Sequence, residues 1–110
     1  MEITNALNAF AALAQPTRLD AFRLLVKHGG DGLSAGELAE ALDVRMNTLS
    51  ANLSVLLNAR LVRNQREGRS IRYFADMEGV RDLLSFLLED CCRGRRDLCQ
   101  PVIDAIACEC

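Results

Sequence analysis

The sequence predicts a mainly α-helical domain with a small β-hairpin, a winged helix-turn-helix in the order α-α-α-α-β-β-α. The first observation is a short amphipathic helix that begins near Asn47 and is followed directly by two β-prone runs, residues 61–66 and 70–75. Gly68 lies between these runs, where a tight hairpin needs a positive φ. The second observation is that four further segments, three before this unit and one after it, carry apolar residues at helical spacing.

The first two helices are predicted from this spacing and from the residues at their ends. Residues 3–14 carry an apolar stripe at i, i+4, i+7 and i+8. Pro16 begins the second helix, where its missing N–H would have no partner, and Gly29 ends it. His28, the single histidine, is expected on the surface at the carboxyl end of this helix. The stripe that the second helix is expected to bury consists of Leu19, Phe22, Leu25 and Val26.

The third and fourth helices have helix-turn-helix spacing. Ser34 and Glu37 form a capping box for a third helix that extends to about Leu42. A short turn at residues 43–44 leads to the fourth helix. Leu49, Leu53 and Leu56 give this fourth helix one face that can pack against a core.

The opposite face of the fourth helix and the hairpin after it are the predicted DNA-binding surface. Short hydrogen-bonding side chains suit a helix whose backbone approaches the floor of a major groove. Between Arg60 and Arg72 there are five arginines against one acid, although the formal net charge of the whole chain is −2. Asn52 is expected to read a base, and Asn47 is expected to cap the helix. The predicted DNA contacts are Arg45, Asn47, Thr48, Ser50 and Asn52 on the helix, and Arg66, Arg69 and Arg72 on the wing.

The last helix is predicted between residues 78 and 91 and has a regular leucine stripe. A single small winged domain leaves little to cover this stripe, so the first and last helices are expected to form a two-fold homodimer interface. The alternative is that both stripes complete the core of the monomer. The predicted interface residues are Leu7, Phe10, Val80, Leu83, Leu84 and Leu87.

Composition limits the class of protein. A chain of 110 residues that is half apolar can form one modest core, and no apolar run is long enough to span a bilayer. Without a secretory signal at the N-terminus, the protein is expected in the cytoplasm, where its five cysteines are expected to be thiols. All five lie in the last twenty residues. The sequence therefore predicts a DNA-binding and dimerisation domain at residues 1–90 and a cysteine-rich tail at residues 91–110.

In order and spacing, the sequence resembles the ArsR/SmtB family of bacterial winged-helix repressors. The resemblance is carried by residues 13–19 (LAQPTRL), 50–56 (SANLSVL) and 66–69 (REGR), together with Leu61 and Tyr73. Two features depart from the family. Residues 36–39 (GELA) lack the Cys-x-Cys of the best-known arsenic site, and Arg60 stands where the family usually has glycine, in a turn that glycine adopts more easily.

The sensing site is therefore expected in the tail, where Cys91, Cys92 and Cys99 resemble the arrangement in a subgroup of arsenite-responsive ArsR repressors. Trivalent arsenic accepts three thiolates, and thiolate ligands select soft ions. Neighbouring arginines favour thiolate over thiol. A zinc or cadmium site needs a fourth ligand, and a disulfide switch uses the same thiols. Cys108 and Cys110 are either an auxiliary thiol pair or an exposed tail.

Together these features predict a homodimeric repressor that binds double-stranded operator DNA and releases it on binding As(III) or Sb(III). The resemblance implies derepression of arsenic-resistance genes. No catalytic residue and no organic cofactor is expected, because the chain has no nucleophile–base or phosphate-binding motif. The alternatives are a thiol-redox or Zn/Cd-responsive repressor of the same fold, an effector-blind DNA-binding module, and a thiol-based protein that uses the winged helix for protein contacts.

Overall fold

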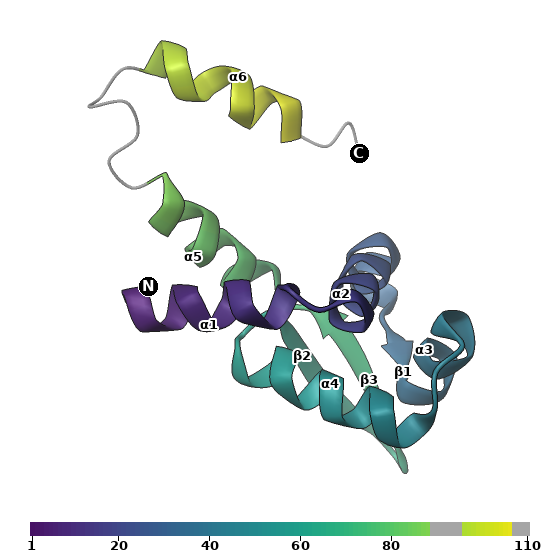
Figure 1. The fold of residues 1–110 in the computed structure, drawn as a ribbon. Helices are drawn as coiled ribbons and strands as arrows, with labels where there is room; N and C mark the ends of the chain where they lie inside the picture. Colours follow the sequence, from purple (N-terminus) through teal and green to yellow (C-terminus); the bar gives the residue numbers. More distant parts are fainter. Residues whose placement is uncertain (89–95, 107–110) are drawn as a thin grey trace.

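The computed structural model describes residues 1–88 and 96–106 of the chain (Figure 1). The helices of these residues are α1 (Ile3–Leu13), α2 (Pro16–His28), α3 (Ala35–Leu42), α4 (Met46–Asn58), α5 (Met77–Leu87) and α6 (Arg96–Ile106), with a short 3-10 turn η1 (Gly29–Asp31) after α2. The strands are β1 (Leu33–Ser34), β2 (Val62–Glu67) and β3 (Ser70–Ala75). The predicted winged helix-turn-helix is confirmed, and β1 and α6 are additions to it.

The three strands form an antiparallel sheet in the order β1-β3-β2. Glu67 pairs with Ser70, so β2 and β3 are joined by a two-residue turn of Gly68 and Arg69. Gly68 has φ 62°, as the hairpin requires. In Figure 1 the hairpin extends away from the end of the molecule where α5 and α6 lie. This hairpin, residues 62–75, is called the wing below.

The core lies between α4, α2, α3 and the base of the sheet. Leu49, Leu53 and Leu56 are buried on α4, as predicted. On α2 the prediction is only partly right, because Leu25 is buried while Leu19 and Val26 are 40% and 42% exposed. The α2 face that packs is centred on Ala21 and Leu25. The small side chain of Ala21 lets α2 approach its neighbours closely. Leu19 and Val26 therefore lie at the edges of the packed face of α2.

The helix α1 buries its small residues and exposes its large ones. Ala6, Ala9 and Ala12 are fully buried against the domain. The predicted apolar stripe points outwards, with Ile3 65%, Leu7 60% and Phe10 38% exposed. The alternative that this stripe completes the monomer core is therefore wrong for α1.

Helix α5 begins at Met77, close to the predicted start, and ends at Leu87. Residues 89–91 of the predicted helix lie outside the described residues. Leu83 is only 5% exposed and belongs to the monomer core, which corrects its assignment to the dimer interface, whereas Leu84 and Leu87 are 40% and 53% exposed. The inward face of the helix is set at its first turn, where Gly79 packs on the backbone of Arg60.

Side chains cap several of the helix ends. The Ser34–Glu37 capping box is present in both directions, at 3.1 Å and 2.9 Å. Gln15 accepts a hydrogen bond from the Arg18 N–H at the start of α2, and the Arg18 guanidinium donates to the Ala12 carbonyl at the end of α1 (2.6 Å). His28 is exposed at the end of α2 as predicted, with Gly29 at φ 54° after it.

Arg60 adopts the turn conformation that its position requires. Its φ is 62°, in the left-handed region that glycine adopts more easily, and its guanidinium lies 3.6 Å from Asp82. Over residues 1–88 and 96–106, no helix has the length and apolar character needed to cross a bilayer.

Candidate nucleic-acid interface

The outward face of α4 carries four of the predicted DNA contacts. Arg45, Asn47, Thr48 and Ser50 are all exposed. Arg45 has extended backbone and stands at the N-cap, so the predicted capping role of Asn47 is wrong. The side chain of Asn47 instead accepts a hydrogen bond from the Thr48 N–H at 2.9 Å. These side chains leave the first turns of α4 short and polar on the side away from the core.

Asn52, the expected base reader, lies on a different side of α4. It is half-buried, and its Oδ1 accepts a hydrogen bond from Arg18 Nη1 at 3.2 Å. Successive positions on a helix differ by about 100°, which turns Asn52 towards α2 and away from Asn47 and Ser50. The structure therefore assigns Asn52 to the packing of α4 against α2, which corrects its assignment as a base reader.

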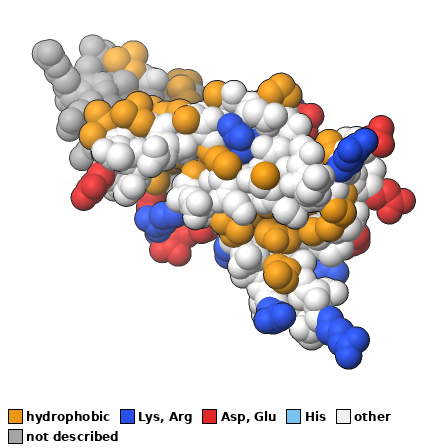
Figure 2. Space-filling model, turned by 60° about the horizontal axis from the view of Figure 1, so that its bottom comes forward, with side chains coloured by type: hydrophobic (Ala, Val, Ile, Leu, Met, Phe, Trp, Pro, Cys, Tyr) orange, Lys and Arg blue, Asp and Glu red, His pale blue; other side chains and the backbone are white. Residues whose placement is uncertain are grey.

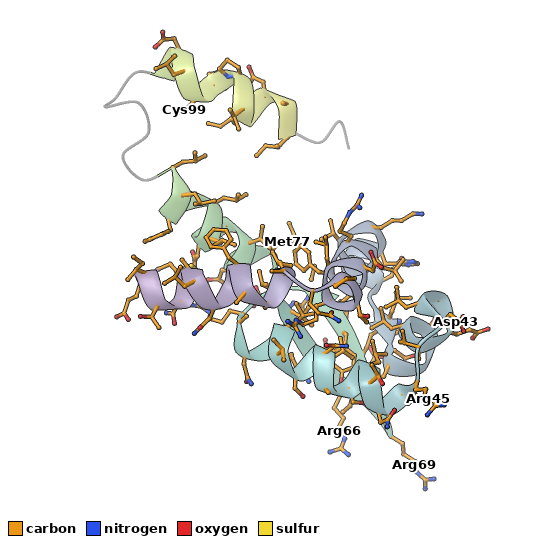
Figure 3. All side chains as sticks on the ribbon, in the orientation of Figure 1. Asp43, Arg45, Arg66, Arg69, Met77 and Cys99 are labelled. Atoms are coloured by element: carbon orange, nitrogen blue, oxygen red, sulfur yellow. The ribbon has the colours of Figure 1, made fainter. Side chains whose placement is uncertain are left out.

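The wing carries exposed arginines at its far end. Figure 3 shows Arg66 and Arg69 extending from the wing, with Arg45 at the same end of the molecule and Cys99 at the opposite end. Figure 2 shows basic side chains gathered at the tip of a projecting part of the surface. A hollow of about 500 Å³ lies between the wing and the helices α3 and α4. Its walls are lined by Ser34, Ala35, Gly36, Ser50, Arg69, Ser70, Ile71 and Tyr73. The arrangement places Ser50 of α4 and Arg69 of the wing around one hollow.

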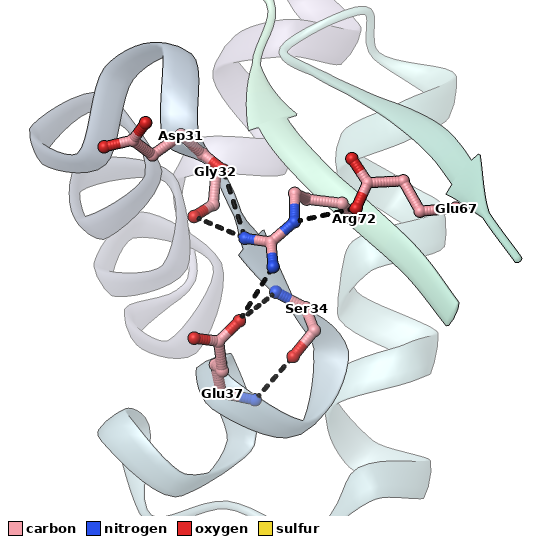
Figure 4. Close-up of polar contacts among 6 residues, drawn as sticks. All are labelled: Asp31, Gly32, Ser34, Glu37, Glu67 and Arg72. Atoms are coloured by element: carbon pink, nitrogen blue, oxygen red, sulfur yellow. Dashed lines mark hydrogen bonds and ion pairs between the residues drawn. The ribbon is translucent and has the colours of Figure 1, made fainter. Parts of the chain in front are cut away.

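Arg72 does not join these arginines at the surface, which corrects its assignment as a phosphate contact. Its Nη1 donates to the carbonyls of Asp31 and Gly32, at 3.1 Å and 3.2 Å (Figure 4). Its Nη2 lies 3.6 Å from Glu37, and its Nε lies 3.4 Å from Glu67. The guanidinium is therefore occupied at the base of the wing.

Glu37 is the group whose titration this geometry changes. The Ser34 backbone N–H donates to its carboxylate, the Ser34 hydroxyl adds to this effect, and Arg72 lies nearby; together they lower the pKa of Glu37 below its ordinary value of 4.5. A carboxylate that is held ionised keeps both its cap and its ion pair at neutral pH.

Sequence reasoning missed Arg18 and Glu67. Arg18 lies in the motif that begins α2. The guanidinium of Arg18 bonds to Ala12 of α1 and Asn52 of α4, and sequence spacing does not reveal contacts between helices. Glu67 is the one acid among the wing arginines, and its position there is the sequence feature that could have indicated an ion pair. Arg63, which was not assigned a role, lies over the ring of Phe74 at 4.3 Å.

Cys99 is the one predicted metalloid ligand that the described residues include. Cys91, Cys92, Cys108 and Cys110 lie outside them. Cys99 lies on α6, is 9% exposed and is disulfide-bonded, whereas a free thiol was expected. Cysteines close enough to share one soft ion are also close enough to oxidise to a disulfide. Within the described part of the chain, no group of three or more metal-ligating side chains is assembled.

The fold and this surface define a winged helix-turn-helix DNA-binding protein. Residues 13–65 match the helix-turn-helix domain family. The chain is 31% identical over 91 residues to the transcriptional repressor SdpR of Bacillus subtilis, covering 83% of this chain and 98% of SdpR.

Two solved structures are similar along most of the chain. An ArsR-like transcriptional regulator from Rhodococcus sp. RHA1 is 28% identical with a TM-score of 0.69, covering 97% of this chain and 96% of the regulator. A homodimeric winged helix-turn-helix DNA-binding domain from Mycobacterium bovis is 25% identical with a TM-score of 0.65, covering 80% of this chain and 82% of the Mycobacterium bovis chain. The chain belongs to the ArsR family of winged-helix transcriptional regulators. These relatives are regulators and not enzymes.

Proposed function

We propose that this protein is a homodimeric transcriptional repressor that binds operator DNA and releases it when As(III) or Sb(III) binds thiolates of its C-terminal tail. The observation that carries the DNA-binding part is the exposed polar face of α4 beside the arginine-bearing tip of the wing. Ser50 and Arg69 both line one hollow, so a duplex that lies across it meets α4 and the wing at once.

The recognition face that we propose is narrower than the sequence alone indicated. Asn47, Thr48 and Ser50 face the major groove, with Arg45 on a flanking phosphate. Arg66 and Arg69 reach the phosphates or the minor groove beside it. In a two-fold dimer each subunit presents this face to one half-site, about one helical turn from the other.

The exposed apolar surface of α1 and α5 supports the homodimer. Ile3, Leu7 and Phe10 on α1 and Leu84 and Leu87 on α5 are at least 38% exposed. The two helices contact each other, so these side chains form one apolar region that a second copy of the chain can cover. The homodimeric winged domain from Mycobacterium bovis is a precedent for such an assembly.

The thiolate site supports the effector. Cys91, Cys92 and Cys99 supply three soft ligands, with Cys108 and Cys110 as auxiliary thiols, and arsenite and antimonite are soft centres that take three thiolates. Ile103 and Ile106 of α6, the helix that carries Cys99, line a groove of about 570 Å³ together with Met77, Val80 and Leu84 of α5. Metalloid binding that moves α6 changes the surroundings of α5, the dimer helix, and so alters the spacing of the two recognition helices. Coupling of about 1 to 3 kcal/mol per site is enough for derepression.

A redox switch is a second candidate, and a specific observation favours it: Cys99 is disulfide-bonded. In that case oxidation of the tail thiols, rather than metalloid capture, changes the position of α6. Zinc or cadmium is a third effector that the same thiolates can bind. All three effectors would regulate the same DNA-binding domain. They differ only in the chemistry that they bring to the tail thiols.

The test is fluorescence anisotropy of the reduced full chain with a labelled duplex from its own promoter, titrated with As(III), Zn(II) and peroxide in parallel. Release by As(III), lost in Cys91→Ser, Cys92→Ser and Cys99→Ser, is the expected result. Binding that responds only to peroxide or zinc contradicts the arsenite assignment and leaves a repressor. Binding that ignores all three identifies an effector-blind module, and the absence of binding overturns the proposed function.

A further inference from the structure

Arg72 lies at a junction of four segments at the base of the wing. It sits on the central strand β3, paired with Ser34 of β1 on one side and with Gln65 of β2 on the other. Its side chain is 31% exposed, and its guanidinium contacts η1, the loop after it, α3 and β2 (Figure 4). A planar guanidinium has donors directed along fixed lines, so these contacts fix its position.

The backbone carbonyls hold this arginine in place before DNA arrives. Nη1 donates to Asp31 O and Gly32 O, two acceptors that belong to the body of the domain. Nη2 reaches Glu37, whose carboxylate is itself held by the Ser34 N–H at 2.9 Å. With this side of the guanidinium anchored, Nε is directed at Glu67 on the wing. The ion pair therefore links β2 to a guanidinium on β3 that is itself anchored to the body of the domain.

Glu67 is the reason that this ion pair matters for DNA. It is the last residue of β2, adjacent to Arg66 and two residues before Arg69, and its side chain is 53% exposed. Even fully extended, two residues span at most about 7 Å, so the turn keeps Glu67 and Arg69 within the screening length of about 8 Å at physiological salt. An uncompensated carboxylate at this position repels the phosphates that Arg66 and Arg69 bind.

We infer that Arg72 is a positioning residue for DNA binding, which neutralises Glu67 and fixes the wing to α3 without contacting phosphate itself. This inference rests on the proposed DNA-binding function. It explains why one arginine of this basic segment directs its guanidinium at the domain, and why the one acid of the wing lies beside it. Arg72 anchors the wing to the domain, and its ion pair with Glu67 removes the charge of this acid from the DNA-facing surface.

A double-mutant cycle with Arg72→Gln and Glu67→Gln tests the inference on the full-length reduced chain, with the labelled promoter duplex and no effector. We expect R72Q to weaken binding about tenfold, a coupling of the size that contacting charged residues show. E67Q alone is expected to change affinity less than about twofold, and R72Q/E67Q is expected to recover to within about threefold of wild type. The slope of log K against log salt concentration in the double variant should equal that of wild type, since no phosphate contact is lost.

Two results would overturn the inference. If Arg72 binds phosphate directly, the two substitutions act additively, the loss persists in R72Q/E67Q, and the salt slope falls by about one. If Arg72 only stabilises the fold, thermal unfolding shifts in R72Q and E67Q restores no DNA binding. Should R72Q fail to fold, R72M keeps an unbranched side chain and completes the same cycle.

The matched control is Arg69→Gln with and without Glu67→Gln. Arg69 is proposed to bind DNA directly, so E67Q should not rescue R69Q and the two effects should add. Failure of the wild-type chain to bind the duplex contradicts the proposed function. Binding by wild type without rescue in R72Q/E67Q contradicts only the inference about Arg72.

Discussion

The two ends of this molecule are both exposed, but they are exposed in different ways. At the wing end the exposed side chains are short and polar on α4 and basic on β2 and the turn after it. At the other end, α1 and α5 expose leucine, isoleucine and phenylalanine, with Leu7 60% exposed and Leu87 53% exposed. Polar surface is stable in water, whereas a continuous apolar patch usually marks a protein contact. The wing end is suited to bind a charged polymer, and the α1–α5 end is suited to bind another protein surface.

The difference shows that apolar periodicity predicts burial but not the chain against which a residue is buried. The monomer packs α1 through Ala6, Ala9 and Ala12 and leaves its larger residues outside. In contrast, α4 places its leucines inside and its small polar residues outside. A helix that contributes alanine to its own core while exposing larger apolar residues is therefore a candidate for a subunit interface.

The largest effect is expected from a charge placed in the apolar surface of α1 and α5. Leu7→Glu or Leu87→Glu should weaken dimerisation more than 100-fold, because each two-fold interface then buries two unpaired charges at a cost of about 3 kcal/mol or more. Analytical ultracentrifugation measures the dimer fraction. Leu19→Glu, on an α2 position of 40% exposure, is the matched control and should leave dimerisation unchanged. Dimers of L7E and L87E as tight as those of wild type would place the subunit interface elsewhere.

The next largest effect is expected where α5 packs on the rest of the domain. A Cβ on Gly79, in the first turn of α5, would clash with the carbonyl oxygen of Arg60. Gly79→Ala should therefore lower the free energy of unfolding by about 2 to 3 kcal/mol, as overpacking against rigid backbone does. Urea denaturation at fixed protein concentration measures it. Gly36→Ala is the control, since the nearest atom to its Cβ is Ser34 Oγ at 3.9 Å, and it should be neutral or stabilising. Equal effects of the two substitutions would contradict the close packing of α5.

A smaller effect is expected from the loss of one arginine of the wing. Arg69→Gln should weaken binding to promoter DNA about tenfold and reduce the salt slope by about one, because one phosphate contact is lost. Anisotropy titrations at several salt concentrations give both quantities. Arg81→Gln removes the same charge from α5, where the side chain is 72% exposed, and should alter neither. If R81Q and R69Q behave alike, the loss reflects net charge and not a contact at the wing.

The smallest effect is the pH dependence of the capping box. Because the Ser34 N–H lowers the pKa of Glu37, the stabilisation is present above the ordinary value of 4.5 and is lost as pH falls below it through the lowered pKa. Thermal unfolding between pH 7 and pH 3 should show a decline in midpoint that is shallower in Glu37→Gln. Identical slopes for wild type and E37Q would show that the cap does not depend on the charge.

Local signals predicted most of the fold. The capping box, the Gly68 hairpin and the inner leucines of α4 each depend on residues within a turn or two, so sequence spacing reveals them. Helix α6 was missed although Leu98, Val102 and Ile106 repeat at i, i+4 and i+8, because Pro101 lies inside the helix.

Long-range partners account for the errors at the candidate site. Asn52 and Arg72 were predicted as DNA contacts from their positions, but Arg18 lies 34 residues before Asn52, and Asp31 lies 41 residues before Arg72. Nothing in the residues around Asn52 or Arg72 indicates these pairings. Leu83 follows the same rule, since the periodicity that marks it as apolar does not tell the monomer core from the subunit interface.

Arg18 also limits how this protein can move. One guanidinium bonds the Ala12 carbonyl at the end of α1 and the Asn52 side chain on α4, while its own backbone starts α2. A shift of α1 relative to α4 would break these bonds, which favours movement of the three helices together. In the proposed homodimer, an effector would then change the distance between the two recognition helices by rotating whole subunits about their shared interface. Small rotations at that pivot are magnified at the wings, which lie farthest from it.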